Sequence, residues 1–304
     1  VGQNACPLAT GLDLSPYDLI LTSLPHYVNK FREEGVTAEY FPIAFDERLL
    51  IRHKTNGPRQ KELTFVGGLG GFHTKGTQIL ETLSAELPLE VWGYGGQQLP
   101  MESMLRKRWR GEAWAEDMYG LLASSKITLN RHIDIAENYA NNMRLYEATG
   151  MGACLVTDSK ANLPCLFEPD QEIVTYRSKA EAVSKIKQLI DQPKVAQEIA
   201  ARGQARTMQK HTYKQRMRDL LHLLQKHCSS EGKQKLRATK PNKILIACTR
   251  KDIHRMPEKA KKALLKQHKN HIFYLLSDTP QATKDTRNMK RWLLSEENDE
   301  VQNT

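Results

Sequence analysis

Short apolar runs alternate with amphipathic stretches along most of the chain. Each run of four to six apolar residues ends in glycine or polar residues, and the stretches between the runs repeat apolar positions at helical spacing. Strands that alternate with helices in this way favour an α/β fold with a parallel, doubly wound sheet. The pattern predicts strands at 17–23, 37–41, 62–66, 88–92, 126–130, 153–158 and 172–176. It predicts helices at 27–35, 75–87, 112–125, 141–152, 178–191, 194–209 and 212–228.

Changes in composition divide the sequence into three parts. Residues 1–45 are too short for a complete Rossmann-like domain, so we expect the end of an N-terminal domain there. Residues 46–232 hold most of the predicted strands and form the second domain. Residues 233–304 begin with a charged linker and predict one βαβ unit, with strands near 243–249 and 271–278 around a helix at 256–268. Because the sequence does not begin with Met, we expect it to start inside a longer protein.

The net charge of +10 is concentrated in one part of the chain. Residues 229–304 carry 17 basic and 9 acidic side chains, out of 45 and 35 in the whole chain, so the remaining body is almost neutral. A basic surface of this kind is compatible with peripheral contact with an anionic membrane. Nucleic-acid binding is disfavoured because few aromatic side chains accompany the charges. No apolar run reaches the length of a membrane span, and the start lacks a signal-peptide pattern. We expect a cytoplasmic protein.

The five cysteines predict neither disulfides nor a metal site. Cys6, Cys154, Cys165, Cys228 and Cys248 are widely spaced and odd in number, and no CxxC pair occurs. A structural zinc site needs closer ligand pairs, so free thiols in a reducing compartment are expected.

Glycine and basic residues follow several predicted strands, at the sheet edge where open α/β sheets bind their ligands. Glycine allows a backbone to approach a ligand closely, although tight turns explain glycine loops equally well. The loops match neither the GxGxxG fingerprint nor a P-loop. The basic side chains that could balance phosphate charge are Lys75, Arg131 and Arg144.

The stretch "NNMRLYEATG" at 141–150 is more informative. If a helix begins near Asn141 or Asn142, its free amides and dipole favour a diphosphate. Arg144 then lies in the first turn, where a cation opposes the dipole unless an anion is bound nearby. Glu147 could accept hydrogen bonds from the two hydroxyls of a ribose, or it could be a surface residue paired with Arg144. Residue spacing alone leaves both interpretations open.

Several motifs within about residues 60–225 occur in a characteristic order and spacing, among them "LTFVGGLGGFHTKGTQILETL", "VWGYGG", "KITLNRHIDIAENYANNMRLYEATGMGACLVTD" and "LFEPDQEIVTY". Together they resemble the nucleotide-sugar domain of CgeB-like proteins, which are related to the group 1 glycosyltransferases. The resemblance implies a GT-B fold with two Rossmann-like domains, of which the second holds the donor. It places Glu147 at the ribose-binding Glu of the E-x7-E motif and Lys75 at a phosphate-facing lysine. Tyr139 stands where the motif carries its first Glu.

The resemblance and the strand ends together predict a donor site. Its candidate residues are Gly67, Gly68, Lys75, Gly95, Asn130, His132, Asn141, Asn142, Arg144, Glu147, Gly150 and Gly152. The resemblance further implies retaining transfer from a UDP- or GDP-type sugar nucleotide to an unidentified acceptor in cell-surface polysaccharide or glycan biosynthesis. It implies no cofactor and no bound metal, and we identify no catalytic residue. His211, in "HTY", is expected to be a packing residue. The alternatives are a non-catalytic sugar-nucleotide-binding module and a Rossmann protein for another nucleotide.

Overall fold

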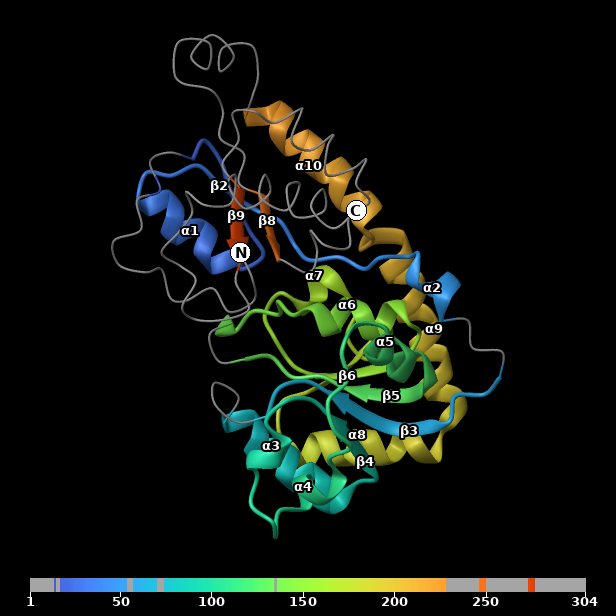
Figure 1. Ribbon diagram of the computed structural model, residues 1–304. Coiled ribbons are helices and arrows are strands. Elements are labelled where there is room, and N and C mark those ends of the chain that lie inside the picture. The colour runs from blue at the N-terminus through green and yellow to red at the C-terminus, as the bar shows by residue number, and fades with distance from the viewer. Residues whose placement is uncertain are drawn as a thin grey trace, which may run out of the picture. The chain divides into compact units, whose positions relative to one another are not determined.

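The computed structural model describes residues 14, 17–53, 57–69, 74–133, 136–227, 246–249 and 273–276 (Figure 1). Contacts between residues divide the chain into two compact units. One unit is Leu19–Leu223, and the other combines Val1–Asp18 with Leu224–Thr304. The sequence-based boundaries at 45 and 232 stay predictions.

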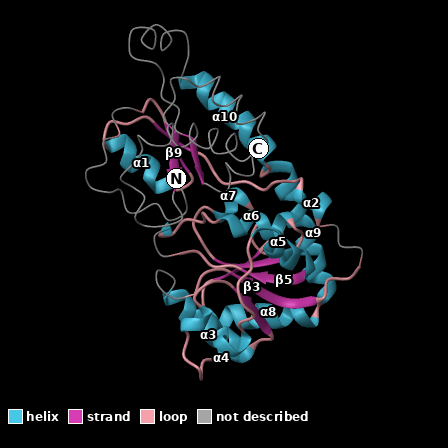
Figure 2. Ribbon diagram, in the orientation of Figure 1, coloured by secondary structure: helices cyan, strands magenta, loops and turns pink. Residues whose placement is uncertain are grey.

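The centre of the larger unit is a five-stranded parallel sheet with the order β4-β3-β5-β6-β7 (Figure 2). Trp109 forms an isolated parallel bridge with Val91 of β4, which extends this order by a single residue pair. The predicted strands and the parallel sheet are therefore confirmed. The strands are β3 (Lys61–Val66), β4 (Leu89–Trp92), β5 (Ser125–Leu129), β6 (Cys154–Asp158) and β7 (Val174–Tyr176).

Helices cover both faces of this sheet, as Figure 1 shows. The first core cluster joins one face to α3, α4, α8 and the start of α9, and the second joins the other face to α5, α6 and α7. The helices are α3 (Thr74–Glu86), α4 (Met104–Arg108), α5 (Ala115–Ser124), α6 (Met143–Gly150), α7 (Leu163–Leu166), α8 (Lys179–Asp191), α9 (Pro193–Lys210) and α10 (Tyr213–His227). The 3-10 turn η2 (Gly96–Gln98) follows β4. Among these, α4 and α7 are too short to show helical periodicity, so the sequence pattern does not reveal them.

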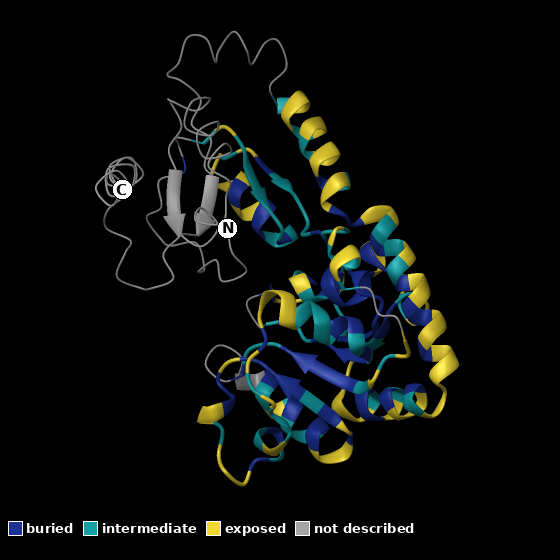
Figure 3. Ribbon diagram, turned by 45° about the vertical axis from the view of Figure 1, so that its right-hand side comes forward, coloured by how far each residue is buried: buried dark blue, intermediate teal, exposed yellow. Residues whose placement is uncertain are grey.

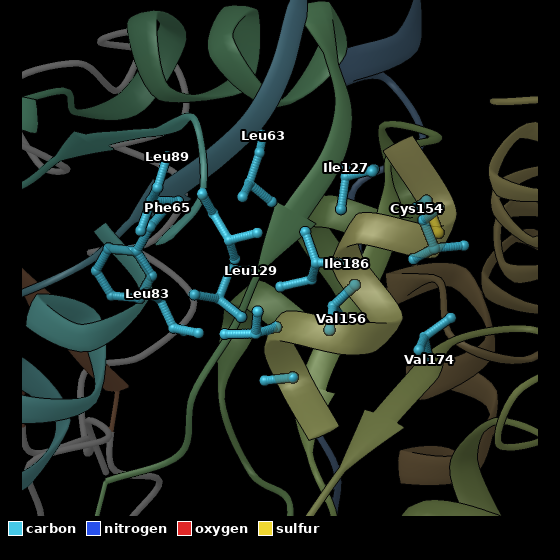
Figure 4. Close-up of a cluster of buried hydrophobic side chains, with 14 of the residues drawn as sticks. Leu63, Phe65, Leu83, Leu89, Ile127, Leu129, Cys154, Val156, Val174 and Ile186 are labelled. Carbon is cyan, nitrogen blue, oxygen red and sulfur yellow. The ribbon is translucent and has the colours of Figure 1, made fainter. Parts of the chain in front are cut away.

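Alternation along the strands explains the two faces. Leu63 and Phe65 point into the first cluster, whereas Val66 belongs to the second, and β5 and β6 alternate in the same way. Figure 4 shows the first cluster, in which Leu83 and Ile186 of the covering helices meet the strand side chains. Each fully buried aliphatic side chain of this kind contributes about 1.5–3 kcal/mol by leaving water. Figure 3 shows how completely the central strands are buried.

Four further elements of the larger unit precede the sheet. The strands β1 (Ile20–Thr22) and β2 (Ala38–Tyr40) pair in parallel around α1 (Pro25–Glu33), as the pattern predicted. The chain turns out of α1 at Gly35, whose φ of 78° suits glycine. The short helix α2 (Leu49–Arg52) lies in a stretch that the pattern left without structure.

Only two strands of the C-terminal region belong to the described residues. β8 (Ile246–Thr249) and β9 (Phe273–Leu276) pair in parallel, as expected for the two strands of a βαβ unit. The helix predicted between them, at 256–268, lies outside the described residues. No helix in the described part of the chain combines the length and the apolar character needed to cross a membrane.

The two cysteines whose surroundings are described are free thiols. Cys154 is buried in β6, and burial raises the pKa of its thiol to about 12, whereas Cys165 is exposed. The pairing state of the other three lies outside the described side chains.

His211 has the packing role that the sequence predicted. It is buried against the rings of Tyr146 and Phe167. Its Nε2 lies 2.8 Å from the Leu166 carbonyl oxygen, and the Arg216 guanidinium donates to its Nδ1 at 2.9 Å. Burial lowers the pKa of His211 to about 4, so the ring is neutral at pH 7.

This buried ring makes stability depend on pH. A histidine in the unfolded chain has a pKa near 6.5. Between pH 7 and pH 5, His211 is therefore protonated in the unfolded chain while it stays neutral in the folded chain. Acidification should therefore remove about 2 kcal/mol of unfolding free energy over this interval. Urea unfolding at both pH values measures the difference, and His211→Gln should reduce it by about 2 kcal/mol. An unchanged pH dependence in this variant, or an equal loss of it in the exposed-site control His222→Gln, would contradict the assignment.

Candidate functional site

The strand order of the sheet reverses between β3 and β5, and the edge beyond the carboxyl ends of these two strands is called the crevice below. The chain passes from β3 to β4 on one side and then returns to β5 on the other, so the strand order reverses between these two neighbours. In open α/β sheets, ligands bind beyond the carboxyl ends of the strands at such a reversal. Gly67 and Gly68 follow β3 at this edge, and Asn130 and His132 follow β5.

The start of α6 lies across this crevice. Asn142 caps the helix, because its Oδ1 accepts a hydrogen bond from the Leu145 amide at 3.3 Å. The same side chain donates to the Oδ1 of Asn130 at 2.7 Å and to the carbonyl of Arg131 at 3.1 Å. The residues after β5 therefore hold the helix N-terminus in place. Asn141 directly precedes the cap.

Arg144, in the first turn of α6, reaches the end of β3. Its Nε donates to the carbonyl of Val66 at 3.1 Å, and its Nη1 lies 2.8 Å from Oε2 of Glu147 and 2.9 Å from Sδ of Met118. The hydroxyl of Tyr119 donates to the other Glu147 oxygen at 3.1 Å. Burial and the Glu147 carboxylate raise the pKa of Tyr119, so this hydroxyl keeps its proton.

These contacts bear on the second interpretation of Glu147, the surface pair with Arg144. The i,i+3 pair with Arg144 exists, but it is not a surface pair, since the two side chains are only 15% and 6% exposed. A carboxylate accepts about four hydrogen bonds, and the protein supplies one to each oxygen. Glu147 is thus a fixed, buried anion at the crevice with capacity for further donors.

Glycines let the loops after β3 and β4 lie against each other. A side chain at Gly93 would collide with the carbonyl of Gly67, and one at Gly95, where φ is 89°, would collide with the carbonyl of Leu69. The Gly67 amide donates to the backbone carbonyl of Trp92 at 2.9 Å, and the Leu69 amide donates to the backbone carbonyl of Tyr94 at 2.9 Å. Gly93 and Gly95 are therefore required for the close approach of the two loops, in which the Gly67 and Leu69 backbones are the partners.

Arg131 lies against the beginning of α3. Its guanidinium occupies the space that a side chain at Gly76 would fill, which explains the small residue in "TKG". A cation beside a helix N-terminus at a ligand edge suits an anionic ligand. Lys75 belongs to the same first turn of α3, and its side chain lies outside the described residues.

His132 is held by Asp158 at the end of β6. Its backbone amide and its Nδ1 lie 2.9 and 2.8 Å from Oδ1 of Asp158. Burial would raise the pKa of Asp158, but the His132 hydrogen bonds and the nearby Lys160 ammonium outweigh it and lower that pKa. The side chain of His132 is fully buried, and among the described residues its Nε2 has no hydrogen-bond partner. The imidazole is thus oriented, with one nitrogen left for a further contact.

Two predicted residues do not lie at the crevice. Gly150 ends α6, about 12 Å along the helix axis from its start, where a side chain would collide with the ring of Phe45. Gly152, with φ of 74°, precedes β6 at the opposite edge of the sheet, where it lines a cavity of about 410 Å³ with Arg59 and Gln204. The structure gives both glycines a packing role.

A polar cavity of about 520 Å³ opens beside the crevice, at the carboxyl ends of β6 and β7. Asp158 and Asn138 line it together with Tyr176 and Arg177. It therefore offers room for a polar group next to the His132–Asp158 pair. The described residues contain no cluster of three or more His, Cys, Asp or Glu side chains arranged to hold a metal ion.

Comparisons with known proteins agree with this geometry. A family model described as glycosyl transferase-like matches residues 75–222, which include α3, the crevice residues of α6 and most of α10. No curated protein sequence matches the chain.

Solved structures share the fold at low sequence identity. A glycosyltransferase from Rickettsia africae is 10% identical with a TM-score of 0.54, and the match covers 72% of this chain and 66% of that one. Anabaena HepE, solved in complex with UDP-glucose, is 14% identical with a TM-score of 0.53, over 69% and 64%. Sucrose-phosphate synthase from Thermosynechococcus elongatus is 13% identical with a TM-score of 0.51, over 73% and 59%.

The fold is that of the GT-B glycosyltransferases. The predicted fold class is confirmed, whereas a closer relation to CgeB-like proteins stays a prediction. The match spans about three fifths to two thirds of the length of these solved chains.

Proposed function

We propose that this chain binds a nucleotide sugar in the crevice between β3 and β5 and is the donor-binding part of a glycosyltransferase. The observation that carries the proposal is the capped start of α6, which lies across the strand-order reversal with a buried carboxylate one turn along the helix. The family-model match and the GT-B fold support the same function.

The proposed roles follow from charge and hydrogen-bonding capacity. The amides of Met143 and Arg144 belong to the first turn of α6, where no intrahelical acceptor exists, and they would donate to the diphosphate. Arg131 would add positive charge from the α3 side. The Arg144 guanidinium already binds Val66 and Glu147, so its role is to orient the carboxylate rather than to contact phosphate. The Ala140 amide donates to Asn162 at 2.6 Å and is not part of the cradle.

Glu147 would accept hydrogen bonds from ribose hydroxyls, and His132 would offer its Nε2 to the donor. Transfer to an unidentified acceptor, with retention of anomeric configuration, completes the proposed reaction. Helix amides and guanidinium groups would stabilise the departing nucleoside diphosphate. We further propose that the enzyme acts in glycan synthesis on the cytoplasmic side of a membrane.

Calorimetric titration tests the donor site. UDP-glucose, UDP-N-acetylglucosamine and GDP-mannose should be titrated separately into the chain, and at least one should bind with micromolar to millimolar affinity. Chromatography of the reaction mixture for free sugar and nucleoside diphosphate then separates an enzyme from a non-catalytic binding module. A chain that binds none of the three overturns the proposal.

Removal of divalent metal ions should leave donor binding unchanged. In the proposed cradle, the positive N-terminal end of the α6 dipole and the Arg131 guanidinium balance the diphosphate charge. Titration of the same sugar nucleotide with and without excess EDTA should give affinities within about twofold. A tenfold loss in EDTA, restored by added Mg²⁺, would show that a metal ion carries this charge instead.

A further inference from the structure

His26, at the second position of α1, is a buried histidine without hydrogen bonds. Its side chain is only 9% exposed. In the part of the chain that the structure describes, neither of its ring nitrogens has a hydrogen-bond partner. A buried polar atom without a partner costs about 1–3 kcal/mol, and two on one ring are unusual in a folded protein. The ring therefore calls for a partner that supplies hydrogen bonds.

Charged and aromatic groups define what this partner can be. The ring stacks on Tyr139 at 5.1 Å with an interplanar angle of 18°, and Tyr27 lies 4.7 Å away. Oε1 of Glu137 lies 3.9 Å from Nε2 of His26, too far for a hydrogen bond, and 3.7 Å from the Lys30 ammonium. Burial lowers the pKa of His26, with Glu137 opposing and Lys30 adding to the shift. At neutral pH the imidazole is uncharged, with one donor and one acceptor.

A neutral hydroxylated ligand fits these surroundings better than an anion. A neutral imidazole offers a phosphate no charge–charge attraction, and the Glu137 carboxylate would repel the phosphate. A hydroxyl group both donates and accepts, which matches a neutral imidazole. The Tyr27 and Tyr139 rings make the rest of the surroundings apolar, which suits an uncharged group.

The loop that His26 contacts leads directly into the proposed donor cradle. Tyr139 precedes the cap Asn142 by three residues, so their Cα atoms are at most about 10 Å apart. The side chain of Asn162 fixes this loop through two hydrogen bonds, of 2.6 and 3.0 Å, to the backbone of Ala140. A sugar attached to a diphosphate at the start of α6 would therefore be within reach of the His26 ring.

We infer that His26 hydrogen-bonds a hydroxyl group of the donor sugar and thereby selects among sugar nucleotides that share one base. This inference rests on the proposed function. The nucleotide contacts come from α6 and Glu147, whereas His26 reads only the sugar. UDP itself lacks the group that His26 contacts.

The test compares UDP with UDP-glucose, UDP-galactose and UDP-N-acetylglucosamine by calorimetry, on the full chain and on His26→Phe. Phenylalanine keeps the stack on Tyr139 and removes both nitrogens. The variant should bind UDP within about twofold of the wild-type chain and should lose about 5- to 10-fold for the UDP-sugar that the wild type binds best. His222→Phe, which makes the same change at an exposed position of α10, should alter neither value.

An unchanged ratio of UDP-sugar to UDP affinity in His26→Phe overturns the inference and leaves the proposed function intact. Equal losses for UDP and the UDP-sugar also overturn it, because His26 would then support the nucleotide site generally. If the wild-type chain binds none of these ligands, the proposed function fails and this inference fails with it. A second measurement uses the wild-type chain alone. The ¹⁵N resonances of the His26 ring should shift on addition of the UDP-sugar and not of UDP, and the absence of such a difference overturns the inference.

Discussion

Glu147→Ala should weaken nucleotide binding by about 1–3 kcal/mol, which is roughly 5- to 150-fold in the dissociation constant. In the proposed site this carboxylate accepts hydrogen bonds from ribose, and a charged acceptor contributes more than a neutral one. Its own position is fixed, because Arg144 and Tyr119 each hold one oxygen. Calorimetry with UDP measures the loss without any contribution from a sugar.

The substitution also leaves the Arg144 guanidinium buried without its counter-ion, so the unfolding free energy must be measured beside the affinity. Glu172→Ala is the matched control, because it breaks a half-buried pair with Arg206, whose Nε lies 2.8 Å from Oε2 of Glu172 on a segment remote from the crevice. This control should bind UDP as the wild-type chain does. If Glu147→Ala folds and binds UDP normally, the carboxylate belongs to the structure alone and the ribose assignment is wrong.

Arg59→Met should destabilise the larger unit by about 4 kcal/mol. The Arg59 guanidinium donates to four backbone carbonyls, those of Leu122, Ala123, Ser125 and Met151, at 2.6–3.1 Å. Three of these acceptors lie where α5 ends and β5 begins, and the fourth lies just after α6. One cation thus satisfies the carbonyls at two helix ends, where helix geometry provides no donors. Burial lowers the pKa of Arg59, yet a guanidinium keeps its charge at neutral pH.

Methionine fills a similar length of side chain and donates nothing, so the four carbonyls lose their half-buried guanidinium donor. Urea unfolding measures the effect, and Arg48→Met is the control. Arg48 pairs with Asp46 at the surface, where its side chain is 82% exposed, and its loss should cost less than about 1 kcal/mol. Equal stability of the two variants would show that water or backbone shifts compensate for Arg59.

Periodicity predicts the strands of this fold because each has a distinct apolar face. Leu63 and Phe65 face one core and Val66 the other, so the alternation is readable before any contact is known. The helices α4 and α7 escape such prediction, since four or five residues are too few to show a helical period. Tertiary packing stabilises them.

The candidate site divides in a similar way. Asn142 as a cap and Glu147 one turn later follow from local helix geometry and could be predicted. Gly150 and Gly152 belong to the same motif, but they lie at or beyond the C-terminal end of α6, far from the crevice at its N-terminal end. Sequence spacing also cannot show that Arg144 turns back to the Val66 carbonyl, because that contact joins residues 78 positions apart.

His26 gives no sequence signal at all. It lies in a short amphipathic helix whose pattern explains Tyr27, Val28 and Phe31 as core positions. Only its stacking on Tyr139, and the lack of partners for its ring nitrogens among the described residues, mark it as a residue of interest. Such a residue is found by accounting for buried polar atoms rather than by reading motifs.

In the proposed function, a nucleotide binds at the start of α6, between β3 and β5. Hydrogen–deuterium exchange with and without saturating UDP tests it most directly, because it reports where amides become protected. Bound UDP should slow exchange in peptides that cover residues 141–147 and 66–69 and should leave exchange in α9, at 193–210, unchanged. Protection at α9 or around the cavity lined by Arg59, with none at 141–147, would contradict it.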